Sequence, residues 1–207
     1  MRKRLRELGQ PDGSLERWFA RLLRDGFALT AGGSFAGFSE VAASSLAAET
    51  QLGLTEQQVA HAVEGFGELT AQPDAVTAIR AAVDAGLRVF TLSNGAATSA
   101  RAFLERVGVS ELVEQVLSID QVQAWKPVPA SYELAVRCAG VPAERVALVA
   151  VHSCDIHGAH QAGLTTGWSP RLEGVPTPVF SVADVVADTL DGAITGLAAL
   201  PSDDNDG

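Results

Sequence analysis

The chain has 207 residues, of which 47% are hydrophobic and 19% are charged, and its formal net charge is -10 at pH 7. These proportions describe a packed globular protein and exclude extensive disorder, and the length suffices for one sizeable domain with an insertion or subdomain. The negative charge repels nucleic acids and anionic membranes, so neither is an expected partner. The expected partners are a small molecule and a second copy of the chain, as a homodimer.

Cysteine usage and apolar runs predict the compartment. Cys138 and Cys154 are too few for a disulfide framework, and their spacing is not that of a zinc site, so a reducing cytoplasm is expected. The basic segment 1–13 is not followed by an apolar stretch of signal-peptide length, and no apolar run reaches 18 residues. We therefore expect a soluble, cytoplasmic protein, with residues 201–207 as an acidic disordered tail.

Residues 1–70 show helical periodicity and no strand pattern. In 14–29 (SLERWFARLLRDGFAL) the apolar residues recur at helical spacing behind Ser14, a predicted N-cap. Residues 35–49 continue this spacing after a glycine-containing break, and a third helix is predicted to start near Thr55. Amphipathic helices without a strand are typical of a cap, so 1–70 is predicted to be a helical cap subdomain.

From Pro73 onward, helices and strands alternate. The predicted order is helix 73–86, strand 87–93, helix 97–108, strand 113–118, helix 129–140, strand 145–151, helix 156–162 and strand 165–168. The run VALVAV is apolar at every position, as expected where helices cover both faces of a parallel sheet. The fold class predicted for 71–200 is therefore α/β, with a Rossmann-like parallel sheet whose strands all end at one edge.

Three polar residues follow or flank the apolar runs. Ser93 ends LRVFTLS, Lys126 precedes Pro127, and Asp155 follows VALVAV. Each has a simpler interpretation by itself: a strand-to-helix turn at Ser93, a solvated loop lysine, and a cap for a helix starting at Ile156. Their order along an alternating pattern instead predicts that they meet at one edge of the sheet.

Three segments resemble the second, third and fourth motifs of the haloacid dehalogenase superfamily. They are LSNG at 92–95, WKPVPASYELA at 125–135 and VAVHSCDIHGAHQAGLTTGW at 149–168. Their order and spacing are similar to those of the type II (S)-2-haloacid dehalogenases, and the cap-like helices agree. The resemblance implies hydrolysis of a carbon-halogen bond in a short 2-halo acid through an aspartyl ester, with no cofactor.

The resemblance also implies catalytic roles. Lys126 would pair with the nucleophilic carboxylate, and Asp155 would hold Lys126 and help to orient the hydrolytic water. Ser93 and Asn94 would bind the carboxylate of the substrate. Tyr132 matches a tyrosine that the family places by the site, and it is assigned to substrate binding.

Two further residues are assigned to substrate binding. His152 stands where these dehalogenases often carry asparagine. It can still donate to an anion, but its charge depends on pH. Phe38 is predicted to close an apolar wall over the pocket from the cap.

A magnesium-dependent phosphatase of the same superfamily is the alternative enzyme. Such phosphatases commonly carry a further aspartate four residues before the Asp155 position, and this chain has Val151 there. His152, His157 and His160 form a compact pattern with Asp155, but only His157 and His160 would share a helix face. No metal site is therefore expected.

The main departure concerns the family's first strand, which ends in the nucleophilic aspartate. No segment before the cap helices has this pattern, and residues 2–11 match the family just after that strand. A late start assignment, a truncated gene and a non-catalytic derivative remain as explanations. The chain as written is expected to be inactive and of low stability, because the first strand is central in this fold.

Overall fold

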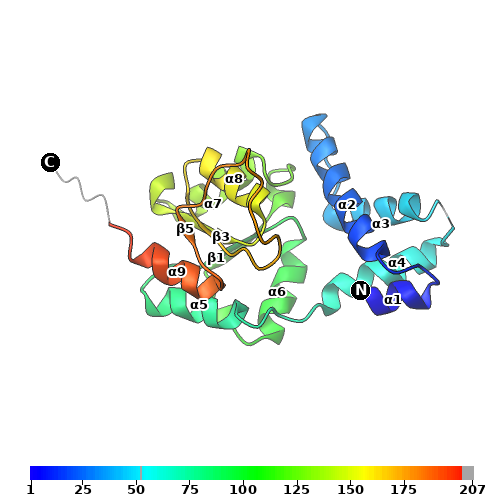
Figure 1. The fold of residues 1–207 in the computed structure, drawn as a ribbon, viewed down its shortest axis with the longest axis horizontal. Coiled ribbons are helices and arrows are strands. Elements are labelled where there is room, and N and C mark those ends of the chain that lie inside the picture. Colours follow the sequence, from blue (N-terminus) through cyan, green and yellow to red (C-terminus); the bar gives the residue numbers. More distant parts are fainter. Residues whose placement is uncertain (52, 202–207) are drawn as a thin grey trace.

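The computed structural model describes residues 1–51 and 53–201, so the predicted acidic tail lies outside the described residues except for Pro201. Helices come first along the chain, and an alternation of helices and parallel strands follows (Figure 1). None of the described helices is both long and apolar enough to cross a membrane.

The helical part contains α1 (Arg2–Glu7), α2 (Ser14–Ala31), α3 (Phe38–Glu49), α4 (Glu56–Glu64) and the 3-10 helix η1 (Gly65–Glu68). Thr55 caps α4 with its side chain, in a capping box with Gln58. The predicted cap at Ser14 is wrong, because Gly13 occupies the N-cap position in a left-handed conformation and Ser14 is the first helical residue. The division of the chain into domains at residue 70 stays a prediction.

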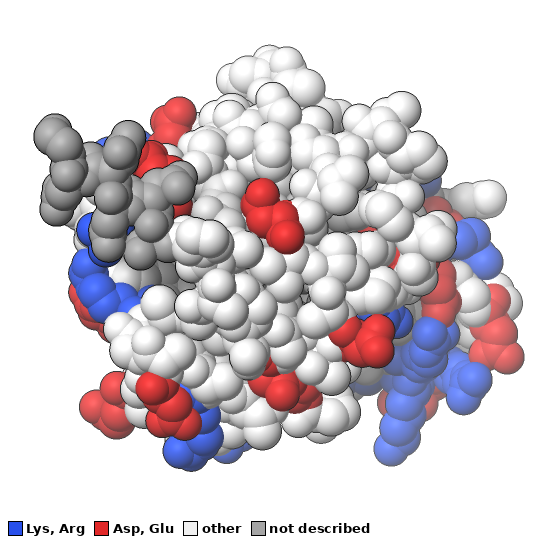
Figure 2. All heavy atoms as spheres, turned by 60° about the vertical axis from the view of Figure 1, so that its left-hand side comes forward, with Lys and Arg blue, Asp and Glu red and all other residues white. Residues whose placement is uncertain are grey.

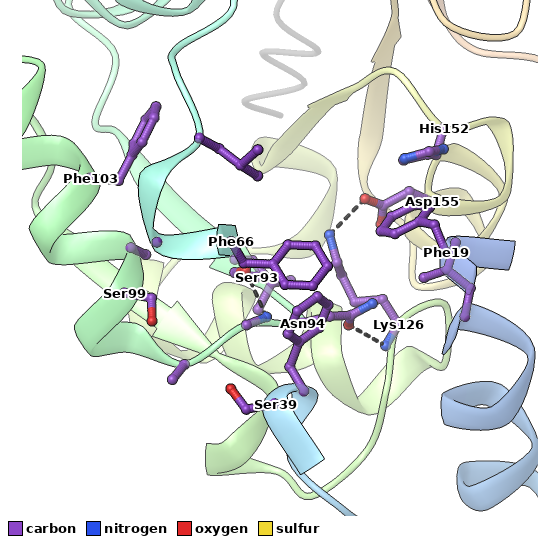
Figure 3. A pocket seen from close by; sticks show the side chains of 18 of the residues that line it. Phe19, Ser39, Phe66, Ser93, Asn94, Ser99, Phe103, Lys126, His152 and Asp155 are labelled. Atoms are coloured by element: carbon purple, nitrogen blue, oxygen red, sulfur yellow. Dashed lines mark hydrogen bonds and ion pairs between the residues drawn. The ribbon is translucent and has the colours of Figure 1, made fainter. Parts of the chain in front are cut away.

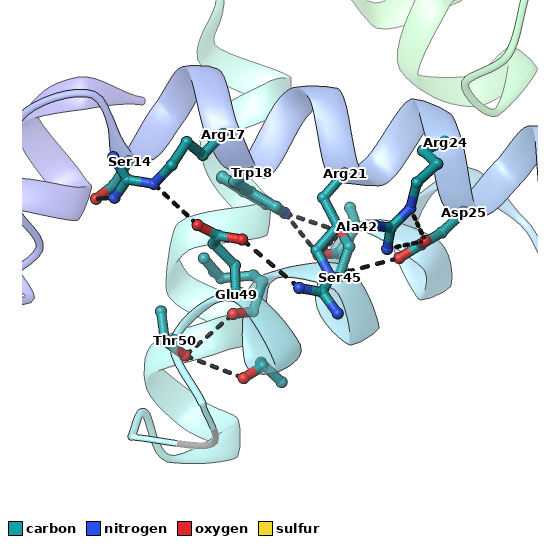
Figure 4. A network of polar contacts seen from close by, with 12 residues as sticks. Ser14, Arg17, Trp18, Arg21, Arg24, Asp25, Ala42, Ser45, Glu49 and Thr50 are labelled. Carbon is teal, nitrogen blue, oxygen red and sulfur yellow. Dashed lines mark hydrogen bonds and ion pairs between the residues drawn. The ribbon is translucent and has the colours of Figure 1, made fainter.

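Helices α2 and α3 pack through a buried polar contact and a row of ion pairs. Trp18 is fully buried, and its indole nitrogen donates to the carbonyl of Ala42 at 2.9 Å. At the surface, Glu49 accepts from Arg17 at 3.0 Å and lies 3.6 Å from Arg21 (Figure 4). Because these ion pairs are partly exposed, each contributes at most about 1 kcal/mol, and burial of Trp18 dominates.

The α/β part comprises α5 (Ala75–Asp84), β1 (Phe90–Ser93), α6 (Ala97–Arg106), η2 (Ser110–Leu112), β2 (Gln115–Ser118), η3 (Ile119–Gln121), α7 (Pro129–Ala139), η4 (Ala143–Arg145), β3 (Ala147–Ala150), α8 (Ser153–Gln161), β4 (Thr165–Trp168), β5 (Val185–Val186) and α9 (Leu190–Ala198). The α/β class with parallel strands is confirmed. Helix α8 begins three residues earlier than predicted, and β5 and α9 were not predicted.

The strands form two parallel sheets, whereas the alternation had indicated one. β1 pairs with β2, with Ser93 opposite Ser118, and the second sheet has the order β3-β4-β5. In the central strand β4, residues 166–168 are buried, whereas no residue of β1 or β3 is. Among the described strands, β1 pairs with β2 alone and β3 pairs with β4 alone. Each of β1 and β3 thus keeps one unpaired edge with free backbone donors and acceptors.

One face of the molecule carries few charged side chains. Figure 2 shows a broad face on which charged side chains are sparse. Val175, Val179 and Val182 are 75%, 83% and 76% exposed. Apolar side chains exposed singly are normal in a monomer, so the expected homodimer stays a prediction.

Trp125 connects the helical part to the α/β part. Its ring is fully buried in the apolar core of the helical part, although the residue lies in the segment before α7. The backbone nitrogen of Trp125 donates to Thr30 Oγ1 at 2.9 Å, and its indole nitrogen donates to the carbonyl of Ala36 at 3.0 Å. A Cβ atom at Gly26 would lie 2.5 Å from this ring, so α2 reaches Trp125 only because Gly26 has no side chain.

We expect Gly26→Ala to destabilise the protein by about 2 kcal/mol, because the new methyl group overlaps the Trp125 ring. The sign is informative, since alanine in place of glycine inside a helix ordinarily stabilises by about 1 kcal/mol. Gly67→Ala is the control, because a Cβ atom there meets no atom within 4 Å. Urea unfolding measures both, and a Gly26→Ala variant as stable as the control would show that the contact is not tight.

Candidate functional site

A cavity of about 980 Å³ lies between the helical part and the carboxyl ends of the strands. The helical part contributes an apolar wall that includes Phe19, Phe27, Phe38, Val63 and Phe66. The α/β part contributes the polar floor, which includes Ser93, Asn94, Lys126, His152 and Asp155 (Figure 3). An apolar wall facing a few convergent polar groups is typical of a small-molecule site.

The end of β1 supplies the first two polar residues. Ser93 is the last residue of the strand, and its hydroxyl oxygen accepts the N–H of Gly95 at 2.9 Å. Asn94 follows, and its side-chain oxygen accepts the backbone N–H of Lys126 at 3.0 Å. This bond uses the acceptor of the Asn94 amide, so its NH₂ group remains as the donor for a ligand.

Lys126 and Asp155 form an ion pair at the centre of the site. Lys126 Nζ lies 2.6 Å from Asp155 Oδ2, and both side chains are 14% exposed. Asp155 lies in the first turn of α8, where the helix dipole favours a negative charge. The predicted pairing of these two residues is confirmed, and Asp155 is not the cap of a later helix.

Tyr132 holds the other oxygen of Asp155. Its hydroxyl donates to Asp155 Oδ1 at 2.5 Å, and the residue is fully buried under the pocket floor. Burial, followed by the charge of Asp155, raises the pKa of Tyr132, so the phenol stays a donor. Tyr132 does not line the pocket, and its predicted contact with substrate is revised to a contact with Asp155.

Gly158 permits this arrangement. A Cβ atom there would lie 2.5 Å from the carbonyl oxygen of Pro127 and 2.7 Å from the hydroxyl of Tyr132. The absence of a side chain lets α8 approach both the Lys126 segment and α7.

The remaining predicted residues lie on the pocket walls. Phe38 stacks on Trp125 with ring centroids 5.8 Å apart and meets Phe66 edge-on at 5.0 Å. His152 lies beside Asp155 on the α/β side (Figure 3). The assignment of Phe38 and His152 to substrate binding stays a prediction. Among the described residues, no group of three or more histidine, cysteine or acidic side chains is arranged to hold a metal ion.

Sequence reasoning missed Glu173, which contacts His152. Its carboxylate accepts the backbone N–H of Ser153 at 2.9 Å and lies 3.3 Å from His152 Nδ1. Burial by itself would raise the pKa of Glu173, but the bonds from Ser153 and His152 outweigh it, and the pKa is lowered. Only its position after the 165–168 strand could have drawn attention to it.

Arg171 and Asp74 were also missed. Arg171 lines the pocket and pairs with Asp74, whose second oxygen accepts the N–H of Leu190 at 2.8 Å. Burial opposes ionisation of Asp74, but the bonds from Leu190 and Arg171 prevail and lower its pKa. Asp74 precedes α5 and thereby ties the start of the α/β part to α9 and to the pocket rim.

The family model for haloacid dehalogenase-like hydrolases matches residues 14–163. The chain belongs to this family. It is 28% identical over 158 residues to haloacetate dehalogenase H-2 of Moraxella sp. (strain B), covering 72% of this chain and 70% of that protein. It is 33% identical over 104 residues to (S)-2-haloacid dehalogenase 1 of Pseudomonas sp. (strain CBS-3), covering 50% of this chain and 46% of that protein.

The fold agrees with this assignment. The structure of the L-2-haloacid dehalogenase from Xanthobacter autotrophicus with covalently bound chloropropionic acid superposes with a TM-score of 0.83. The match covers 91% of this chain and 86% of that enzyme at 22% identity, so it shows the fold alone. The recognition made from three motifs is thereby confirmed.

We expect Lys126→Met to reduce the free energy of unfolding by about 3 kcal/mol, because it leaves the buried Asp155 carboxylate without a cation. The double variant Lys126→Met/Asp155→Asn should recover part of this loss. Lys3→Met is the control, since the Lys3 side chain is 90% exposed. Urea unfolding at pH 7 measures all three, and equal stability of the single and double variants would contradict a strong pair.

We expect Asp74→Asn to cost about 2 kcal/mol at pH 7, because the ionised carboxylate accepts two charge-assisted bonds. The folded pKa of Asp74 lies below its ordinary value of 3.8, so this stabilisation is present above pH 4 and disappears as the pH falls. The difference in unfolding free energy between wild type and variant should therefore shrink below pH 4. The exposed Asp84→Asn is the control, and a difference that grows on acidification would reverse the assignment.

Proposed function

We propose that the pocket is a site for short 2-halo acids and belongs to a hydrolytic dehalogenase that uses no metal ion. The observation that carries this proposal is the convergence of Ser93, Asn94, Lys126 and Asp155 on one pocket floor, in a chain of this family. The carboxylate of the substrate would accept from Ser93 and Asn94. Its carbon-halogen end would face the apolar wall that contains Phe38.

The chemistry requires a carboxylate that displaces the halide and forms an ester, which water then hydrolyses. Lys126 would keep that carboxylate ionised, and Asp155 would keep Lys126 in place. Asp155 itself is a poor nucleophile, because Lys126 and Tyr132 occupy both of its oxygens. Among the described residues, Asp155 is the carboxylate within ion-pair distance of Lys126. That this chain lacks the nucleophile stays a prediction.

Binding of (S)-2-chloropropionate, measured by isothermal titration calorimetry, tests the proposed site. We expect saturable binding that EDTA does not change, and about tenfold weaker binding by Asn94→Ala through loss of one hydrogen bond to a charged group. Ser110→Ala, outside the pocket, is the control. No binding at any pH would overturn this proposal. Magnesium-dependent hydrolysis of a phosphate ester would replace it with the phosphatase alternative.

Chloride release provides a separate prediction. We expect the 207-residue chain alone to release chloride from 2-chloropropionate no faster than buffer, because Asp155, the described carboxylate beside Lys126, is bonded through both of its oxygens. An ion-selective electrode or a chromogenic chloride assay measures this rate. Multiple turnovers per chain would show that a nucleophile is present, would support dehalogenation and would make the prediction of an inactive chain wrong.

A further inference from the structure

The cations that line the pocket are already matched by carboxylates. Lys126 pairs with Asp155, and Arg171 pairs with Asp74. Among the described residues, a substrate carboxylate that enters the pocket therefore finds hydrogen-bond donors but no unpaired Lys or Arg side chain. Burying an anion without a counter-charge is costly, so the site needs another source of positive charge.

His152 is the group that can supply this charge. It lies on the pocket wall beside Asp155 (Figure 3), and its Nδ1 atom is 3.3 Å from the Glu173 carboxylate. A proton on Nδ1 facing Glu173 leaves Nε2 as the ring nitrogen for the pocket. There it accepts from a ligand when neutral and donates to one when protonated.

The other charged groups around His152 agree with this assignment. The titratable and charged residues that line the same pocket as His152 are Glu64, Lys126, Cys154, Asp155 and Arg171, and Glu173 contacts His152 directly. Glu64 lies 3.8 Å from Arg4, and burial, with the nearby acidic charges, raises the pKa of Cys154 and keeps the thiol neutral. Glu173 is thus the carboxylate in direct contact with the imidazole, 3.3 Å from Nδ1.

We propose that Glu173 holds His152 toward the pocket and that binding of the substrate carboxylate is coupled to protonation of His152. The inference rests on the proposed function and adds a recognition step to it. An imidazolium between Glu173 and the ligand carboxylate bridges two anions. The affinity for a carboxylate therefore rises as the pH falls through the range in which histidine titrates.

Calorimetry in two buffers of different ionisation enthalpy tests the coupling by counting the protons taken up on binding. The probes are (S)-2-chloropropionate and acetate, and propionamide is the uncharged control. At pH 8, above the range in which histidine ordinarily titrates, we expect uptake of nearly one proton for each carboxylate bound and none for propionamide. The affinity for the carboxylates should fall by up to tenfold for each unit by which the pH rises. His152→Asn should abolish the uptake, whereas His160→Asn, an exposed residue of α8, should retain it.

Glu173→Gln distinguishes the positioning role from simple proximity. Glu173→Gln removes the anionic partner of His152 Nδ1, so the pH above which carboxylate affinity declines should move to lower values. Wild-type binding without proton uptake, or equal uptake by His152→Asn, would overturn the inference. An unchanged midpoint in Glu173→Gln would overturn the role of Glu173.

The two proposals fail in different ways. Acetate binding with proton uptake, but without any binding of 2-chloropropionate, would keep the coupling and remove the proposed function. Binding of 2-chloropropionate without proton uptake would keep the proposed function and remove the coupling to His152. Absence of binding by either carboxylate would overturn both.

Discussion

The structure of the site depends on one buried ion pair. Lys126 and Asp155 come from segments 29 residues apart, and their 2.6 Å contact places the end of β3 beside the segment that leads into α7. Such a pair is stable only when its remaining hydrogen-bonding capacity is used. Tyr132 supplies the second bond to Asp155, and Asn94 fixes the backbone of Lys126, so both sheets contribute to the same cluster.

The same segment couples this cluster to the helical part. Trp125, the neighbour of Lys126, is buried among the helices and stacks on Phe38, which forms part of the apolar wall. Movement of the helices relative to the strands would therefore displace the residue next to the central lysine. Because Trp125 packs on Phe38 and is bonded to Lys126, the apolar wall of the cavity has a defined position over its polar floor.

Charge matching gives the pocket its chemical character. Among the described residues of the pocket, Lys126 and Arg171 are each paired with a carboxylate. In the proposed site, a carboxylate ligand would therefore depend on hydrogen-bond donors and on the charge that His152 gains when it is protonated. Such recognition would be specific, because hydrogen bonds from the NH₂ group of Asn94 and the imidazole of His152 would act over short distances and in defined directions. It is also sensitive to protonation, because histidine is the group whose charge changes near neutral pH.

The sequence by itself determined most of the helices, the strands β1 to β4 and the polar residues near their ends, because hydrophobic periodicity and motif order can be read along the chain. It therefore identified Ser93, Asn94, Lys126 and Asp155 as neighbours. The tertiary structure alone decided the pairing of Arg171 with Asp74, the contact of Glu173 with His152 and the burial of Tyr132, since these involve partners 97, 21 and 23 residues apart. It also decided the division into two sheets, because a strand's pattern of side chains shows which faces are covered but not which neighbour its backbone will bond.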